Sequence, residues 1–585
     1  LGQLRSGHFD RALYLTSKST GQLQVVDTLA RMTAPASSNL IGYSNSERSP
    51  EGAAADHGSA GTAVAAWHVR NKSEHCVNHT FHCVRESCAY LDQVETRWSQ
   101  SGLARFYLDE KHARDLDTLR AAGRHARICP YEITRTALAF NDVWIADYNY
   151  VFAPANRGIF YSQPGFEPAR TLLLLDEAHN LPSRVADAYS HVARAADTRA
   201  LLAELDHLEA PKPLQRAWES WTLLLSALRP VDALDPALEA DVADTLARIA
   251  DYLGTLPLDY GALGPQFSDL LWKTQTLNEW LDNGQLKKLL WCPAEGELAF
   301  TCIDAADAIG SVLKEYGGVV CASATFGPEA EFAGACGLAD ADPTTPTRSH
   351  SVVRAATPWR DSAYDVAVDA RVDTSFQQRT RFSGTTAATV AALHTAASSA
   401  GPVGSRAVAV FFPSYAYAET IARELEKISP MRVALQPRIR DLATQTAWVE
   451  ESVVFSDALF LVLGSSFAES IDLLGGRVTH AMVVGPALPE VNAVQRARLA
   501  EFSPLGRVTA FRRVYQIPGM TKVNQALGRL VRAPGQRARV LLHCRRFLEP
   551  SYASLLARDY QFGANLLNDE DFDRWLSSAL PVDAR

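Results

Sequence analysis

Short, mostly apolar runs recur along the chain and set its expected architecture. They cover four to six residues each and occur at 11–16, 172–175, 319–322, 407–412, 459–463, 481–484 and 540–543. Runs of this kind are typical of parallel strands that are buried on both faces. Residues 185–290 instead place apolar side chains three and four positions apart, which predicts helices. The pattern predicts an α/β protein with two parallel-sheet halves and a helical insertion between the first strands and the later ones.

Polar segments separate these elements. Residues 17–22 predict a turn after the first strand, and a helix pattern follows to about Met32. Residues 33–62, rich in Ser, Ala, Gly and Asn, predict a loop, and the Thr- and Ser-rich residues after Pro343 predict a linker. No apolar run approaches the roughly 20 residues that span a bilayer, so we expect no membrane partner.

Charge is unevenly distributed along the 585 residues. The net charge is −9, which gives no general support for a nucleic-acid partner, but residues 511–547 carry nine basic side chains and no acidic one. Such a stretch should face phosphates of a nucleotide or of DNA, although a solvated basic surface is the alternative. The odd number of cysteines, nine, argues for a reducing, cytoplasmic compartment. The alanine-rich composition favours a bacterial source, and a protein of this kind would be nucleoid-associated.

An acidic tetrapeptide follows the four leucines at 172–175. It reads Asp176, Glu177, Ala178 and His179. An aspartate at a strand end can hold Mg²⁺ through water, and the next glutamate can orient and deprotonate an attacking water. His179 would couple this site to the neighbouring strand. A chance acidic start to a helix is the alternative interpretation, because acidic residues favour helix N-termini.

Four cysteines stand apart from the other five by their spacing. Three are clustered, at Cys76, Cys83 and Cys88, and the fourth, Cys129, precedes a proline. Thiolates are the usual ligands of iron–sulfur clusters. Structural zinc is a rival because one pair has a four-residue spacing, but zinc usually needs two such pairs. The remaining cysteines are expected to be unligated core residues.

The acidic tetrapeptide belongs to a series of motifs that resembles one protein family. Residues 175–181 (LDEAHNL) are similar to motif II of the superfamily 2 helicases, in the DEAH-type form found in the XPD/DinG iron–sulfur DNA helicases. Other motifs follow in the order of that family: 16–20 (TSKST) as motif Ia, 147–150 (DYNY), 323–325 (SAT) as motif III, 412–415 (FPSY) as motif IV, 464–472 (GSSFAESID) as motif V and 525–532 (QALGRLVR) as motif VI.

The resemblance implies a set of functional residues. Asp176 would bind Mg²⁺, Glu177 would act as the base, and Arg529 and Arg532 would stabilise charge on the γ-phosphate. These two arginines, with Gln525 and Gly528, are expected to lie on two turns of one helix. The further residues implied to contact nucleotide or DNA are His179, Glu469, Asp472, Gln525 and Gly528. Ser470 replaces the glycine that commonly follows the motif V glutamate, which puts the tight turn there in doubt.

The resemblance also implies cofactors, partners and domains. The cofactors would be ATP, Mg²⁺ and a 4Fe-4S cluster held by Cys76, Cys83, Cys88 and Cys129. We expect a monomer acting on single-stranded or forked DNA, moving 5′ to 3′ in repair or replication. The fold would be two RecA-like domains of the P-loop NTPase type, with an iron–sulfur insertion and a helical arch insertion in the first. The expected boundaries are 1–64, 131–189 and 301–349 for the first RecA-like domain, 65–130 for the iron–sulfur domain, 190–300 for the arch and 350–585 for the second RecA-like domain.

One expected motif is missing from the 585 residues. No Gly-x4-Gly-Lys-Ser/Thr phosphate-binding loop occurs, although it should precede motif Ia. Without that loop the chain should bind and hydrolyse ATP poorly, and we expect that an N-terminal piece has been truncated. Two other functions stay open. One is an inactive DNA-binding or assembly subunit of the same fold, and the other is a nuclease that uses the fold for delivery, although no clustered carboxylate set supports a nuclease.

Overall fold

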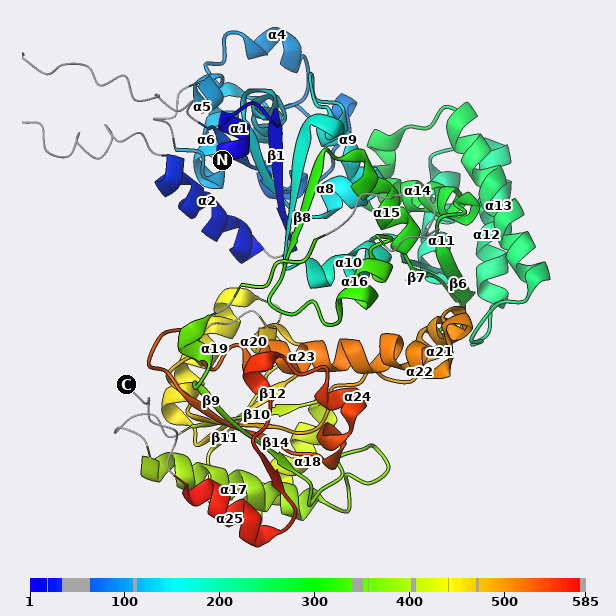
Figure 1. Ribbon diagram of the computed structural model, residues 1–585. Helices are drawn as coiled ribbons and strands as arrows, with labels where there is room; N and C mark the ends of the chain where they lie inside the picture. The colour runs from blue at the N-terminus through cyan, green and yellow to red at the C-terminus, as the bar shows by residue number, and fades with distance from the viewer. Residues whose placement is uncertain are drawn as a thin grey trace, which may run out of the picture. The chain divides into compact units, whose positions relative to one another are not determined.

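The chain forms two compact units in a computed structural model (Figure 1). The structure describes residues 1–17, 19–33, 64–108, 113–338, 351–355, 357–400, 407–439, 441–469 and 473–578, and for a few of these, Glu469 among them, only the backbone. Unit 1 comprises Leu1–Ser323 and Ala333–Ala341, and unit 2 comprises Ala324–Phe332 and Asp342–Arg585. The segment 324–332 therefore groups with unit 2, whereas the sequence places it in the first domain. The loop predicted at 33–62 and the linker after Pro343 lie almost entirely outside the described residues.

Unit 1 is built on a five-stranded, wholly parallel sheet in the order β2-β3-β1-β4-β8. In chain order its strands are β1 (Arg11–Thr16), β2 (Ala66–His68), β3 (Val143–Ala146), β4 (Thr171–Asp176) and β8 (Gly318–Ala322). Three of the predicted apolar runs are thus strands of one sheet. The helices of unit 1 outside the inserted module are α1 (Gly2–Arg5), α2 (Ser19–Thr33), α3 (Lys72–His75), α4 (Val94–Trp98), α5 (Arg105–Leu108), α6 (Leu116–Ala126), α7 (Pro130–Ala137), α8 (Asn149–Phe152), α9 (Pro154–Tyr161), α10 (Leu181–Ala188) and α15 (Ala306–Glu315). Helix α16 (Glu329–Ala335) contains residues of both units.

A separate module interrupts unit 1 between β4 and β8. Its four helices are α11 (Ala195–His207), α12 (Lys212–Ala227), α13 (Pro236–Thr255) and α14 (Tyr260–Asp282). They enclose their own core, in which Trp218, Trp221 and Ile249 are fully buried. The prediction of a purely helical segment is wrong in one respect. The module also contains an antiparallel sheet, ordered β5-β7-β6, whose strands are β5 (His191–Arg194), β6 (Lys287–Trp291) and β7 (Glu297–Asp304).

Unit 2 contains a seven-stranded parallel sheet in the order β11-β12-β10-β13-β14-β9-β15. In chain order the strands are β9 (Tyr364–Asp369), β10 (Val408–Phe412), β11 (Val433–Leu435), β12 (Ala458–Val462), β13 (His480–Val483), β14 (Ala538–Leu542) and β15 (Ala564–Leu566). Every residue of β10, β12, β13 and β14 is buried, as expected for continuous apolar runs. The sheet is therefore covered on both faces.

Helices form two separate cores on the faces of the second sheet. The helices of unit 2 are α17 (Ser383–Ala400), α18 (Tyr415–Glu426), α19 (Leu442–Phe455), α20 (Ser466–Glu469), α21 (Ala493–Glu501), α22 (Arg507–Phe511), α23 (Ile517–Leu527), α24 (Pro550–Ala553) and α25 (Asp569–Ser577). One core contains side chains of α17, α18 and α25, and the other contains side chains of α19, α20, α23 and α24. Within the described ranges, no helix is long and apolar enough to span a bilayer.

Candidate functional site

The carboxyl end of β4 places two acidic side chains at the edge of the first sheet. Asp176 is the last residue of β4 and is in register with Thr16 of β1 and Ala322 of β8. Because these strands are parallel, their carboxyl ends meet at the edge where open α/β sheets bind ligands. Glu177 follows in the left-handed conformation, with φ of 52°, and its N–H donates to Asp176 Oδ1 at 3.0 Å. The arrangement suits Mg²⁺ binding and water activation by adjacent carboxylates.

Two tyrosines pack against this strand end. The Tyr148 hydroxyl donates to the backbone carbonyl of Asp176, and Tyr14 comes from the neighbouring strand β1. Burial, and after it the negative charge of Asp176, raises the pKa of both tyrosines well above the ordinary value. Both hydroxyls therefore stay protonated and act as donors beside the carboxylate.

His179 connects the acidic tetrapeptide to the end of β8. Its side chain is only 7% exposed, and its Nδ1 lies 2.8 Å from Ser323 Oγ and 3.4 Å from Glu177 Oε2. Ser323 directly follows β8, which pairs with β4. The contact joins the segments that resemble motifs II and III. A movement of either strand end would therefore shift His179 and, through it, the Glu177 carboxylate.

The segments that resemble motif Ia and the DYNY stretch flank the same edge. Thr16 is buried at the end of β1, but Lys18 and the side chains of Ser19 and Thr20 are outside the described part. Helix α2 begins at Ser19, so the turn after β1 is shorter than predicted. The Asp147 carboxylate accepts hydrogen bonds from the Asn149 N–H and the Arg184 guanidinium.

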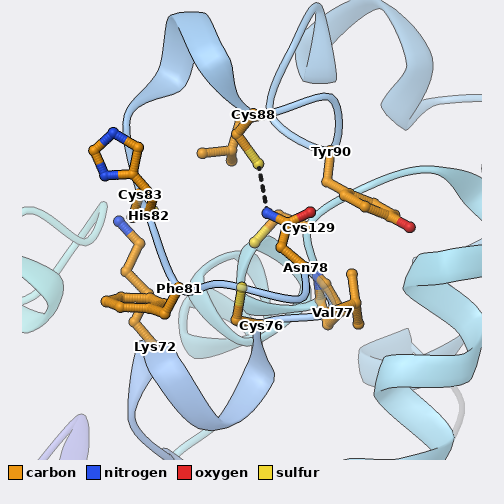
Figure 2. A pocket seen from close by; sticks show the side chains of 12 residues that line it. Lys72, Cys76, Val77, Asn78, Phe81, His82, Cys83, Cys88, Tyr90 and Cys129 are labelled. Atoms are coloured by element: carbon orange, nitrogen blue, oxygen red, sulfur yellow. Dashed lines mark hydrogen bonds between the residues drawn. The ribbon is translucent and has the colours of Figure 1, made fainter. Parts of the chain in front are cut away.

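Four cysteines of unit 1 line a single pocket (Figure 2). Cys76 follows α3, Cys88 follows a 3-10 turn at Arg85–Ser87, and Cys129 immediately precedes α7. Figure 2 shows the side chains of Cys76, Cys88 and Cys129 pointing toward one another, and Cys83 completes the lining. The Cys129 N–H donates to the Tyr90 carbonyl at 2.9 Å, which ties the distant cysteine to the clustered three. The fold thus brings the four residues selected by spacing to one place.

The surroundings of the pocket act on the sulfur atoms of Cys88 and Cys129. Asn78 donates from Nδ2 to the Cys88 sulfur at 3.4 Å, an interaction that suits a sulfur carrying negative charge. Burial raises the pKa of Cys129 to about 11, so without a metal this thiol stays protonated. Across the described ranges, no three His, Cys, Asp or Glu side chains are arranged to hold a single metal ion. Of the remaining cysteines, Cys321 is half-buried and the other four are buried.

In unit 2, a buried glutamine joins the segments that resemble motifs IV and V. Gln436 follows β11 and is 3% exposed. Its Nε2 donates to the Tyr415 hydroxyl at 2.6 Å, and its Oε1 accepts from the Val462 N–H at 2.8 Å and from Ser465 Oγ at 3.1 Å. Gln445 Oε1 likewise accepts a hydrogen bond from Ser466 Oγ at 2.6 Å. Hydrogen bonds to two buried side chains, Gln436 and Gln445, therefore hold the loop between β12 and α20 in place.

The motif V carboxylates, those of Glu469 and Asp472, lie outside the described part of the chain. Glu469 ends α20, its side chain is outside the described part, and Asp472 and Ser470 lie outside it entirely. The backbone before them turns at Gly464, which has φ of 82°. A Cβ there would lie 2.9 Å from Lys522 Cε, so the α23 lysine crosses directly over this glycine.

The segment that resembles motif VI is not the two-turn helix that was predicted. Helix α23 ends at Leu527, so Gln525 is helical, Gly528 caps the helix, and Arg529 and Arg532 lie in the turn beyond it. Glycine commonly ends helices, and the next strand, β14, begins six residues after Arg532. The two arginines therefore do not share a helix face.

The basic stretch at 511–547 has mixed surroundings. Arg539 is 2% exposed and donates to Asp365 at 2.8 Å, so it is a structural residue inside the sheet. Arg512 lies 3.5 Å from Glu331, and Arg545 lies 2.7 Å from Asp373. The prediction that the whole stretch faces phosphates is therefore wrong for Arg539.

Two parts of the chain match known protein families, and its fold is similar to solved structures. The DEAD_2 family matches residues 61–196, and the helicase C-terminal domain family matches residues 402–561. An XPD helicase structure has a TM-score of 0.57 at 14% identity, with 95% of this chain and 92% of that chain covered. The structure of S. tokodaii Xpd4 has a TM-score of 0.50 at 15% identity, with 82% and 95% covered.

The chain belongs to the XPD/DinG-like superfamily 2 helicases. The two-sheet α/β fold predicted from the apolar runs is the fold of this family. Curated relatives of this XPD/DinG-like chain include two regulator of telomere elongation helicase 1 homologs. The one from Oryza sativa subsp. japonica is 36% identical over 110 residues, and the one from Anopheles gambiae is 26% identical over 136 residues.

These matches are short. They cover 18% and 23% of this chain, and the chain spans only 10% and 13% of the length of those relatives. Both relatives are eukaryotic, so the bacterial, nucleoid-associated source suggested by composition gains no support.

Sequence reasoning missed two features of this helicase-family site. Gln436 and Gln445 belong to no motif, and only their deep burial beneath the motif V loop shows their part in it. A polar residue directly after a short apolar strand is the sequence signal that marks Gln436. Nothing comparable marks Gln445, which lies within a helix.

Proposed function

We propose that the protein is an ATP-dependent DNA helicase or translocase that moves 5′ to 3′ on single-stranded DNA and serves DNA repair or replication. One observation carries the proposal: the Asp176–Glu177 pair ends a central parallel strand, and His179 links it to Ser323 at the end of the next strand. In this scheme a nucleotide-driven change at the carboxylates is passed to the adjoining strand end.

Each acidic residue has one proposed task in ATP hydrolysis. Asp176 would hold Mg²⁺ at the strand end, and Glu177 would orient and deprotonate the attacking water. The backbone leaves the strand at Glu177 in the left-handed conformation, and the Glu177 carboxylate lies 3.4 Å from His179 Nδ1. Arg529 and Arg532 would stabilise the γ-phosphate charge, with Gln525, Gly528, Glu469 and Asp472 at the nucleotide and DNA contacts.

The hydrolysis proposal depends on a phosphate-binding loop. That loop, absent from the 585 residues, supplies the backbone nest and lysine that hold the β- and γ-phosphates. Turnover therefore requires that the loop be supplied from outside this sequence. The second candidate is an inactive DNA-binding or assembly subunit of the same fold. That candidate predicts DNA binding with no ATP turnover even when the loop is present.

We further propose that Cys76, Cys83, Cys88 and Cys129 bind a 4Fe-4S cluster. Their side chains line one pocket. A 4Fe-4S cluster binds each of its four thiolate ligands through a different iron atom. A bound cluster would cross-link residues 76–88 to the start of α7. Asn78, which donates to the Cys88 sulfur, would then stabilise a ligand. Structural zinc usually takes its ligands from two closely spaced pairs in the sequence, and of these four cysteines only Cys83 and Cys88 form such a pair.

The test is a visible absorption spectrum with iron, sulfide and zinc analysis on anaerobically purified chain. We expect a broad band near about 400 nm and about four iron atoms per chain, as for a thiolate-bound 4Fe-4S cluster. Cys88→Ser should lose the band, and Cys321→Ser, at a cysteine outside the pocket, should keep it. Colourless protein carrying one zinc would refute the cluster and leave the motor residues unaffected.

A further inference from the structure

The carboxyl ends of β9, β13 and β14 bring a second group of polar residues together in unit 2. These three strands are parallel neighbours, with β14 between the other two. Thr374 follows β9, Gly485 follows β13, and Arg546 follows β14. Their meeting point is at the ligand-binding edge of a parallel sheet, but none of them belongs to the helicase motifs.

The Thr374 hydroxyl and the Arg546 guanidinium converge over Gly485. Gly485 has φ of 81°, and a Cβ at this position would collide with Thr374 Oγ1 and lie 3.7 Å from Arg546 Nη2. Only glycine fits this backbone and this approach. The absence of a side chain at residue 485 leaves the two donor groups facing one space.

Both groups have unsatisfied donors. Thr374 is 4% exposed, and neither its Oγ1 nor Arg546 Nε has a hydrogen-bond partner in the part of the chain that the structure describes. Buried polar atoms are almost always paired, so these two donors are available to a bound ligand. Asp373, the residue before Thr374, accepts from Arg545 at 2.7 Å and from the Ser375 N–H at 2.9 Å, and its charge also acts on Arg546. A hydroxyl and a guanidinium that approach the same glycine can both donate to one anionic oxygen.

An exposed aromatic side chain follows Thr374 by two residues. Phe376 is 79% exposed, and the Arg379 guanidinium lies 4.5 Å from its ring centre and 5.0 Å from that of Tyr417. Exposed aromatic rings with adjacent cations are the surfaces on which single-stranded nucleic acids stack their bases. A free anion would bind the two donors without contacting Phe376, whereas a nucleotide within a strand would contact both the donors and the Phe376 ring.

We propose that Thr374 and Arg546 bind one backbone phosphate of a single-stranded nucleic acid and that Phe376 stacks on an adjoining base. The inference rests on the proposed function, because it names residues that hold the strand on which a helicase would move. It adds a contact at β9, β13 and β14, separate from the segments that resemble motifs IV and V.

The test is fluorescence anisotropy of the whole chain with a fluorescein-labelled 20-nucleotide oligo-dT, measured over a series of salt concentrations. Arg546→Gln should weaken binding and reduce the slope of log affinity against log salt by about 0.7, the value for one phosphate contact on a single strand. Thr374→Val, which keeps the side-chain shape, should weaken binding severalfold. Phe376→Ala should weaken binding about fivefold or more and leave the salt slope unchanged.

Control variants and competitors separate the possible outcomes. Arg423→Gln removes an exposed cation from the distal part of α18 and should leave binding and slope unchanged. Because Phe376 is exposed, Phe376→Ala keeps the test valid even if a buried variant fails to fold. Wild-type binding with unchanged affinity and slope in all three variants would overturn this site but not the proposed function. No binding by the wild-type chain would contradict both. Inorganic phosphate binding that depends on Arg546, without oligonucleotide binding, would make this a free-anion site.

Discussion

Replacing Gln436 by leucine should loosen the motif V loop by a calculable amount. The Gln436 side chain has three hydrogen-bond partners in a fully buried position: Tyr415, Val462 and Ser465. Leucine has a similar volume but no polar atom, so the Val462 N–H would be left without its acceptor. An orphaned buried N–H destabilises by about 1–3 kcal/mol, and the lost bond to Tyr415 adds about 0.5–1.5 kcal/mol. Greater apolar burial offsets part of this, giving a net of about 2 kcal/mol.

The assay is amide hydrogen exchange by mass spectrometry on peptides that cover residues 458–467. A loss of about 2 kcal/mol in local opening free energy corresponds to roughly 30-fold faster exchange. Tyr415→Phe removes only one of the three bonds and should accelerate exchange about fivefold. Peptides that cover β2, in unit 1, serve as the internal control. Exchange within twofold of wild type in the Gln436→Leu loop would refute the idea that this side chain holds motif V in place.

Two further predictions concern the acidic pair and a buried histidine. In whatever length of the protein hydrolyses ATP, Glu177→Gln should abolish turnover and leave oligonucleotide binding nearly intact, and a near wild-type rate would show that Glu177 is not the base. Burial, with help from the Arg539 charge, lowers the pKa of His480 to about 4. The unfolded chain therefore binds a proton below about pH 6.5 that folded unit 2 does not, so stability is greatest above that pH and falls toward pH 4. Between pH 7 and pH 5, the free energy of unfolding measured in urea should fall by roughly 2 kcal/mol less in His480→Asn than in wild type. Equal losses in the two proteins would contradict the lowered pKa of His480.

The apolar runs locate the central strands because those strands are buried on both faces. The run at 172–175 lies within β4, and the runs at 407–412 and 459–463 match β10 and β12 to within one residue. The criterion fails at β9, whose sequence YDVAVD carries acids at both ends of its apolar positions. Asp365 is tolerated there because Arg539 of β14 donates to it across the sheet. A strand whose polar residues are neutralised by a partner far along the chain gives no local signal.

Because a sequence pattern carries only local information, it also indicated some of the site residues and missed others. Asp176 and Glu177 were placed from the sequence because a strand end and its chemistry are local, and the cysteine spacing likewise singled out four residues that share a pocket. The end of α23 at Leu527 was not anticipated, although Gly528, directly after it, is a residue that commonly ends helices. Thr374 and Arg546 have meaning only together with Gly485, more than sixty residues from Arg546 and over a hundred from Thr374. Tertiary contacts of this kind are invisible to any pattern of neighbouring residues.

The module between β4 and β8 has a consequence for how the protein is made. Strand β4 ends at Asp176 and its sheet neighbour β8 begins at Gly318, so about 140 residues are synthesised between two strands that must pair. At about 5–20 residues per second, a ribosome needs roughly 7–28 s for that stretch, during which one edge of β4 has no partner. The separate core around Trp218 and Trp221 allows the module to fold during this interval. Nascent chains paused just before residue 318 should therefore be the species most dependent on chaperones, because an apolar strand edge is exposed in them.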